Sequence, residues 1–217
     1  MTRRIDPGLI PPFPNLSFEH ALWKAGLPAV SGIDEAGRGC LAGPVAAAAV
    51  VLDKQDDIAN KLGEIKDSKQ LSPQARERAR KMIEIHSLTW AVGFADNQEI
   101  DQLGIVPATR LAVWRALDRL TIIPDHLLVD FLTLPDLAIP QTRLVKGDAR
   151  SLSIAAASIL AKTHRDAMMA ANAEKYPDYG FEKNKGYGTA THRDAILSFG
   201  PCPLHRLTFA PLRKIEE

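Results

Sequence analysis

GIDEAGRG, residues 32–39, is the most informative stretch of this sequence. An acidic pair, Asp34 and Glu35, ends the apolar run PAVSGI, and Gly37 and Gly39 then mark a tight turn. Carboxylates at the end of a buried strand are costly unless they are paired, hydrogen-bonded or bound to a cation. The stretch therefore predicts a buried strand that presents two carboxylates at a functional site.

Outward from this stretch, the hydrophobic patterns alternate between strands and helices. The segment GPVAAAAVVL lies at hairpin spacing and favours a second strand, although its alanines would also permit a helix. Further strands are predicted at residues 88–96, 126–131 and 142–146. Helices are predicted for residues 74–85, 97–120 and 151–176. Ser72 and Pro73 begin the first of these, and the small residues of the third imply close packing. A further helix is predicted after Thr191, which forms a capping box with Asp194. This order predicts α/β layers around a mixed sheet.

Length, charge and cysteine content narrow the class of protein. A chain of 217 residues with 46% hydrophobic residues fits one large soluble domain, or a domain with a small appendage, rather than two full domains. It has no apolar run long enough to cross a bilayer. With only Cys40 and Cys202, and no HExxH motif, we expect a reducing cytoplasm and no zinc site. The net charge of +1 is low for a nucleic-acid coat protein. Residues 141–193, however, hold nine basic and five acidic side chains, which suits either a polyanion-binding face or a solvated helix.

Two further acids stand at comparable positions. Asp130 ends the apolar run HLLVD, and Asp148 closely follows the last predicted strand. Each acid alone is equally typical of a polar loop. Together with Asp34 and Glu35 they form an oxygen-only donor set, which suits Mg²⁺ or Mn²⁺ and which would repel itself without a cation. Two such ions about 4 Å apart can clamp the attacking water and the leaving oxygen of a phosphodiester.

The order of these motifs resembles bacterial ribonuclease HII from about residue 29 to residue 213. The matching blocks are GIDEAGRGCLAGPV, DSKQLS, LLVD, VKGD, SIAAASILAKTHRD and KGYGT. The resemblance implies a ribonuclease H-like α/β fold with a mixed central sheet flanked by helices and a small helical C-terminal extension. It also implies that Asp34, Glu35, Asp130 and Asp148 are metal-binding catalytic carboxylates. The implied reaction cuts RNA in RNA–DNA hybrids, and single ribonucleotides embedded in duplex DNA, leaving 3′-hydroxyl and 5′-phosphate ends.

The resemblance also assigns residues to the substrate. Its glycine turn reads the ribose 2′-hydroxyl through the backbone, its tyrosine stacks on the next deoxyribose, and two lysines lie near the nucleic-acid backbone. The corresponding residues here are Gly37, Arg38, Gly39, Tyr187, Lys69 and Lys162. The chain departs from the family pattern at Phe131 and Leu132, where the family commonly has Gly-Asn, and at Asn184, where a histidine is frequent.

Three other interpretations compete with this one. An integrase or junction resolvase would share the carboxylates but would not need the glycine turn or the tyrosine. A binding module without catalysis would not need a costly anionic cluster. A dinucleotide-binding enzyme would need GxGxxG, whereas GRGCLAG has one residue too many. Asp166 lies in a predicted helix near Arg165, where it can form a surface ion pair, and it is left out of the metal set.

The resemblance divides the chain into three parts. We expect an extended N-terminal lead-in over residues 1–27, without the apolar core of a signal peptide, and a ribonuclease H-like catalytic domain over residues 28–176. Residues 177–217 are expected to form a loop and helical extension that completes the substrate face. Nothing in the sequence indicates an oligomer, so we expect a cytoplasmic monomer that binds RNA–DNA hybrid and ribonucleotide-containing duplex DNA.

Overall fold

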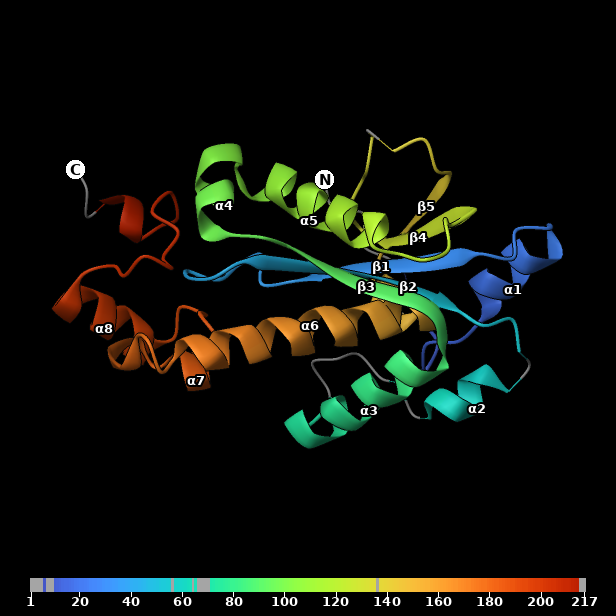
Figure 1. Ribbon diagram of the computed structural model, residues 1–217, viewed down its shortest axis with the longest axis horizontal. Coiled ribbons are helices and arrows are strands. Elements are labelled where there is room, and N and C mark those ends of the chain that lie inside the picture. The colour runs from blue at the N-terminus through green and yellow to red at the C-terminus, as the bar shows by residue number, and fades with distance from the viewer. Residues whose placement is uncertain are drawn as a thin grey trace.

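The computed structural model contains one mixed sheet with the strand order β3-β2-β1-β4-β5 (Figure 1). The structure describes residue 6 and residues 10–55, 57–63, 65, 71–135 and 137–214. The strands are β1 (Val30–Ala36), β2 (Val45–Leu52), β3 (Ser87–Ala95), β4 (His126–Asp130) and β5 (Gln141–Leu144). The predicted α/β class and the strand at the alanine-rich segment are thus confirmed.

The central strand β1 brings two acidic positions to the same edge of the sheet. It pairs antiparallel with β2, where Asp34 lies opposite Ala48, and parallel with β4, where Ile33 lies opposite Val129. Parallel neighbours run in the same direction, so their carboxyl ends meet at one edge. Asp34 and Asp130 therefore lie side by side at the end of adjacent strands.

Helices cover both faces of the sheet, with α4 and α5 on one side and α6 and α3 on the other (Figure 1). None of the helices in the described part of the chain combines the length and the apolar character needed to cross a membrane. The helices are α1 (Ser17–Lys24), α2 (Ile58–Leu62), α3 (Pro73–His86), α4 (Asn97–Leu103), α5 (Ile105–Asp118), α6 (Leu152–Asn172), α7 (Phe181–Asn184) and α8 (Ala190–Phe199).

The close packing predicted from the small residues of α6 is confirmed. A Cβ atom on Gly32 of β1 would lie 2.1 Å from the backbone carbonyl carbon of Ser153 in α6. On the opposite face, a Cβ atom on Gly93 of β3 would lie 2.1 Å from the carbonyl oxygen of Ala112 in α5. Two backbones can approach this closely only at a glycine. These two contacts fix the helices directly on the sheet that carries the acids.

The extended lead-in predicted for residues 1–27 is wrong over part of its length, because α1 occupies the segment Ser17–Lys24. Glu19 on α1 is fully buried at the start of α6. Its Oε1 accepts hydrogen bonds from Ser151 Oγ at 2.6 Å, Ser153 Oγ at 2.7 Å and Ser153 N at 3.0 Å. A carboxylate at a helix N-terminus also interacts favourably with the helix dipole. This segment is therefore docked onto the helix that packs against the site.

Two other details of the helices differ from the prediction. The single helix expected over residues 97–120 is interrupted at Gly104, whose φ of 82° ends α4 and begins α5. The capping residue of α8 is Thr189 rather than Thr191, since the Thr189 side chain accepts from the backbone N–H of His192. The hydroxyl oxygens of the two threonines lie 3.1 Å apart. The observed cap thus stands two residues before the predicted one.

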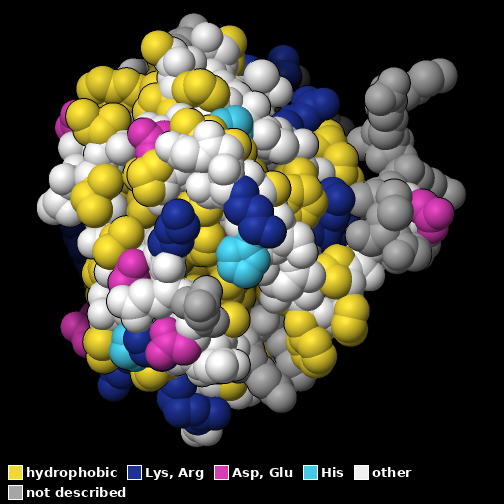
Figure 2. Space-filling model, turned by 90° about the vertical axis from the view of Figure 1, so that its right-hand side faces the viewer, with side chains coloured by type: hydrophobic (Ala, Val, Ile, Leu, Met, Phe, Trp, Pro, Cys, Tyr) yellow, Lys and Arg dark blue, Asp and Glu magenta, His cyan; other side chains and the backbone are white. Residues whose placement is uncertain are grey.

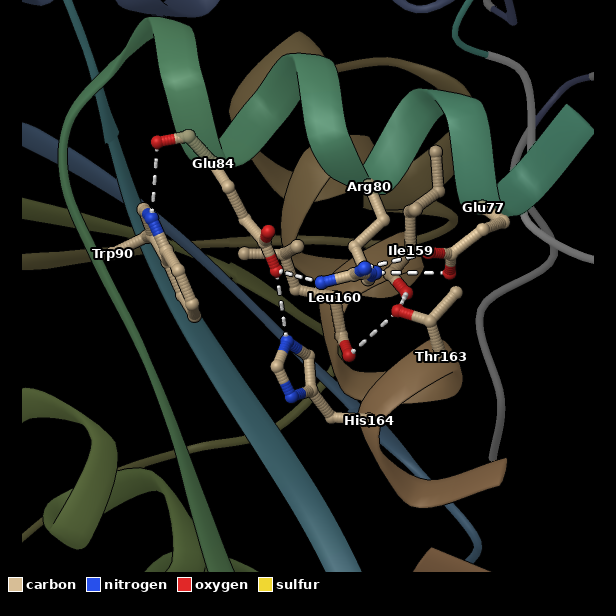
Figure 3. A network of polar contacts seen from close by, with 8 residues as sticks. All are labelled: Glu77, Arg80, Glu84, Trp90, Ile159, Leu160, Thr163 and His164. Carbon is tan, nitrogen blue, oxygen red and sulfur yellow. Dashed lines mark hydrogen bonds and ion pairs between the residues drawn. The ribbon is translucent and has the colours of Figure 1, made fainter. Parts of the chain in front are cut away.

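A polar network fastens α3 to β3 and α6 (Figure 3). Arg80 bridges Glu77 and Glu84 along α3, and His164 Nε2 of α6 lies 3.1 Å from Glu84 Oε1. The indole N–H of Trp90 in β3 donates to the backbone carbonyl of Glu84 at 3.3 Å. The helix that follows the DSKQLS segment is thus held against the same α6 that flanks the acidic edge.

Candidate active site

Three of the four predicted carboxylates line one cavity of about 200 Å³ at the carboxyl ends of β1 and β4. Asp34 and Glu35 come from β1 and Asp130 from β4, as the parallel pairing requires. The remaining wall consists of Ala36, Gly37, Ser158, Lys162 and Tyr187. The cavity therefore joins the acidic edge of the sheet to α6 and to the loop that carries the tyrosine.

Each of these carboxylates is held by a donor of the protein. Asp34 Oδ1 accepts from the backbone N–H of Glu35 at 2.7 Å, and Asp130 Oδ1 accepts from the N–H of Gly147 at 2.7 Å. Glu35 Oε1 forms an ion pair with Arg38 Nη1 at 2.9 Å. Local backbone and one arginine thus set the orientation of all three groups.

The acidic edge concentrates negative charge in a buried place. Burial raises the pKa of Asp34 well above its ordinary value, and the charges of Glu35, Asp130 and Asp148 raise this pKa further. A hydrogen bond with Ser158 acts in the opposite direction. A cation among these oxygens would relieve both the desolvation and the mutual repulsion.

Asp148 is buried in the short 3₁₀ turn Gly147–Ala149, beside the cavity rather than in its wall. Asp148 lies next to the other acids, because its charge raises the pKa of Asp34 and because its neighbour Gly147 donates a hydrogen bond to Asp130. The donor chemistry fits a hard divalent cation. Among the described residues, however, no group of three or more acidic, histidine or cysteine side chains has an arrangement that could hold an ion. Glu35 is engaged by Arg38, and a cation at the acidic edge would compete with this ion pair.

Of the two glycines in the turn at residues 37–39, only Gly37 is required by the local structure. Gly37 has a φ of 90°, and a Cβ atom there would lie 1.9 Å from Nε of Arg165. Around Gly39, by contrast, a Cβ atom would meet nothing within 4 Å, so its backbone faces open space. Arg38, between them, has a partly exposed side chain. A ligand can therefore approach the backbone of this turn from outside.

Tyr187 and Lys162 lie together at the rim of the cavity. Lys162 Nζ is 5.0 Å from the centre of the Tyr187 ring and forms an ion pair with Asp166 at 2.8 Å. Tyr187 as a whole is 40% exposed, so a ligand can reach this residue from the solvent. The expected ion pair of Asp166 is thus present, with Lys162 as its partner, whereas Arg165 is fully buried and binds backbone carbonyls. The predicted residue Lys69 lies outside the described residues.

The two departures from the family pattern have clear local structures. Phe131 adopts a φ of 53°, and the N–H of Leu132 closes a tight turn onto the carbonyl of Asp130. This is a backbone conformation that favours glycine, so a phenylalanine there is strained. Asn184 is buried and shapes the loop before Tyr187, because its side chain accepts from the N–H of Gly186 at 2.7 Å.

Sequence reasoning missed three residues that surround the site. Ser158 lines the cavity and bonds to Asp34, while Arg165 and Arg206 are fully buried beneath the turn. The only available signal was indirect: arginine is rarely buried without a specific partner. That signal is visible only once burial is known.

Several known proteins are similar to this chain. Residues 31–212 match the sequence model of the family described as Ribonuclease HII. The Ribonuclease HII of Chloroflexus aurantiacus is 52% identical over 203 residues, covering 92% of this chain and 94% of that protein. The ribonuclease H2 of Pyrococcus horikoshii OT3 has a TM-score of 0.68 at 27% identity, covering 86% of this chain and 96% of that one. Bst-RNase HIII, solved in complex with Mn²⁺, shares the fold with a TM-score of 0.67 at 24% identity, covering 86% and 68%.

Proposed function

This chain belongs to the ribonuclease HII family, and from that premise we propose its substrates and the roles of its residues. It hydrolyses the RNA strand of RNA–DNA hybrids and cuts at single ribonucleotides embedded in duplex DNA, leaving 3′-hydroxyl and 5′-phosphate ends. The observation that carries the proposal is the cavity in which Asp34, Glu35 and Asp130 meet Gly37 and Tyr187. It combines groups suited to phosphodiester hydrolysis with a backbone turn open to a ribose.

We assign the metal to the acidic edge. Asp34, Glu35, Asp130 and Asp148 would hold Mg²⁺ or Mn²⁺, the hard cations that carboxylate oxygens prefer. Divalent metal bound there supplies neutralisation of the phosphate charge and activation of water. The chain itself orients the carboxylates of Asp34 and Asp130, through the N–H groups of Glu35 and Gly147.

The substrate contacts divide between the two parts of the chain. The turn at residues 37–39 reads the 2′-hydroxyl, and the side chain of Arg38, once released from Glu35, can bind a phosphate. Tyr187 stacks on the sugar of the next nucleotide, and Lys162 and Lys69 contribute charge along the backbone. Residues 28–176 thus act as the catalytic domain, and residues 177–217 complete the substrate face. We also propose that the enzyme works as a cytoplasmic monomer, with Cys40 and Cys202 remaining free thiols.

The test is cleavage of a DNA duplex that contains one ribonucleotide, with and without Mg²⁺ or Mn²⁺. We expect a single nick that requires the metal and that is absent from the matched all-DNA duplex. Asp34→Asn should abolish turnover while it preserves binding, whereas Asp118→Asn, an exposed acid on α5, should change neither. Equal cutting of the all-DNA duplex would refute ribose recognition, and near-normal turnover by Asp34→Asn would refute the metal assignment.

Tyr187 gives a second test within the same assay. Tyr187→Ala should lose more activity on the single-ribonucleotide duplex than on a long hybrid, because only the former has a fixed junction for the ring to sense. The same loss on both substrates would remove the junction-sensing role and leave the carboxylate assignment standing.

A further inference from the structure

Two arginines are completely buried beneath the glycine turn and bind backbone carbonyls. Arg206 donates to the carbonyl oxygens of Gly37 at 2.8 Å, Arg38 at 2.9 Å and Gly43 at 2.9 Å. In the described part of the chain, neither Arg206 nor Arg165 forms an ion pair with a carboxylate. An arginine buried in this way is costly, so its exact set of partners requires an explanation.

We propose that Arg206 is the positioning residue that turns the amide groups of residues 38 and 39 outward, toward the ribose of the substrate. This inference rests on the proposed function of the same site. It adds a residue from the C-terminal segment to the part of the enzyme that distinguishes a ribose from a deoxyribose.

The geometry of the peptide bond determines the direction of the N–H groups in the turn. The peptide bonds of the turn are trans, so the carbonyl and the N–H of each peptide unit point in opposite directions. Arg206 draws the carbonyls of Gly37 and Arg38 inward, and the N–H groups of Arg38 and Gly39 must then point outward. Among contacts between described residues, neither N–H donates to a protein acceptor. Two adjacent donors are thus directed at the open space around Gly39.

The chemistry of the side chain explains why arginine occupies this position. A guanidinium presents several donors in a rigid plane, so Arg206 can bind three carbonyls at once, whereas a lysine ammonium lacks this planar fork. Burial lowers the pKa of Arg206 to about 10, which still leaves it protonated at neutral pH. Its positive charge therefore lies directly behind the two outward N–H groups and makes them better donors to a ribose oxygen.

Arg115 on α5 provides the control. It donates to the backbone carbonyl of Phe94 at 2.7 Å and forms an ion pair with Glu99 at 2.6 Å, and both partners lie outside the turn. Arg165 does not serve this purpose, because its side chain packs against Gly37. Substitution of Arg115 or Arg206 by lysine removes the planar fork from a backbone carbonyl. Only the Arg206 substitution should release the carbonyls of the turn.

The experiment compares affinities in the Asp34→Asn background, which prevents cutting. Binding is measured by fluorescence anisotropy on one duplex with a single ribonucleotide and on the same duplex with the 2′-deoxynucleotide. We expect Arg206→Lys to reduce the preference for the ribonucleotide by about tenfold, the loss of roughly one hydrogen bond. Arg115→Lys should keep this preference. A folded Arg206→Lys protein with an undiminished preference would overturn the proposal.

Two further outcomes keep the interpretations separate. If the Asp34→Asn protein itself shows no preference for the ribonucleotide, ribose recognition in the proposed function fails, whatever Arg206 does. If Arg206→Lys does not fold, amide hydrogen exchange on the Asp34→Asn protein decides the matter. The N–H groups of Arg38 and Gly39 should exchange rapidly in the free protein and become protected by the ribonucleotide duplex only. Protection in the free protein would show that they point inward and would overturn the proposal.

Discussion

A buried histidine pair predicts how the stability of this enzyme depends on pH. His192 Nε2 and His205 Nε2 lie 3.1 Å apart, and both side chains are buried. The N–H of Cys202 donates to His205 Nδ1 at 2.9 Å, so this nitrogen carries no proton and His205 Nε2 is the donor to His192. His192 Nδ1 must then donate to the carbonyl of Tyr187, 2.9 Å away. Neither ring can accept a second proton without the loss of one of these bonds.

The magnitude follows from the pKa of His205. Burial lowers this pKa from 6.5 to about 4, and burial also lowers the pKa of His192. Between pH 6.5 and pH 4, the unfolded chain therefore binds a proton that the folded chain excludes, so stability falls as the pH falls. At about 1.4 kcal/mol per pH unit, His205 alone removes about 2 kcal/mol by pH 5 and about 3 kcal/mol by pH 4.

Urea unfolding at a series of pH values measures this loss. The raised pKa of Asp34 acts in the opposite direction, because protonation of this acid on acidification favours the folded state. Comparison with His205→Asn, which keeps an acceptor for Cys202 N–H, separates the two effects, since both proteins retain Asp34. The variant should lose less stability between pH 6.5 and pH 5, whereas His20→Asn, at an exposed site, should match the wild type. Equal pH slopes for the wild type and His205→Asn would refute the assignment of neutral, proton-excluding rings.

Three substitutions test the packing around the site. Gly32→Ala should destabilise the protein by about 3 kcal/mol and lower its activity, because the new methyl group meets the backbone of Ser153. Urea unfolding measures the stability and the nicking assay measures the activity. An unchanged midpoint of urea unfolding would contradict this contact. Glu19→Ala should cost about 3 kcal/mol in urea unfolding, since it removes the acceptor of three buried hydrogen bonds, and a cost typical of the surface would show that α1 is not docked. Ser72→Ala should cost about 1 kcal/mol, through loss of the cap of α3, with no change in KM.

The fold was largely predictable because its strands and helices are local patterns. The run that ends at Asp34, the apolar segment before Asp130 and the serine cap of α3 each signal their element within a few residues. The break at Gly104 was not predictable in this way, because the helical hydrophobic period continues across it. Nor was α1, since its docking depends on Glu19 reaching the start of α6, far away in sequence.

The acids of the candidate site were predictable because they, too, follow from local patterns at the ends of strands. Acids at strand ends converge when the strands are adjacent and parallel, and β1 and β4 satisfy that condition. The arginines beneath the turn gave no local signal, because their partners are carbonyls distant in sequence from Arg165 and Arg206. Every residue has a backbone carbonyl, so no sequence motif identifies the carbonyls that these arginines bind.

The adjacent residues His205 and Arg206 connect the C-terminal segment to the turn at residues 37–39 and to the loop that carries Tyr187. Arg206 holds the carbonyls of the turn at Gly37, and His205, through His192, supports the carbonyl of Tyr187. Three of the four carboxylates stand instead on β1 and β4, whose pairing does not involve this segment. Substitution of His205 or Arg206 should therefore impair the proposed recognition of the ribose and of the RNA–DNA junction more than it disturbs the arrangement of the acids. On the proposed assignments, the residues that recognise the substrate and those that hold the metal are therefore supported by different parts of the chain, although both line one cavity.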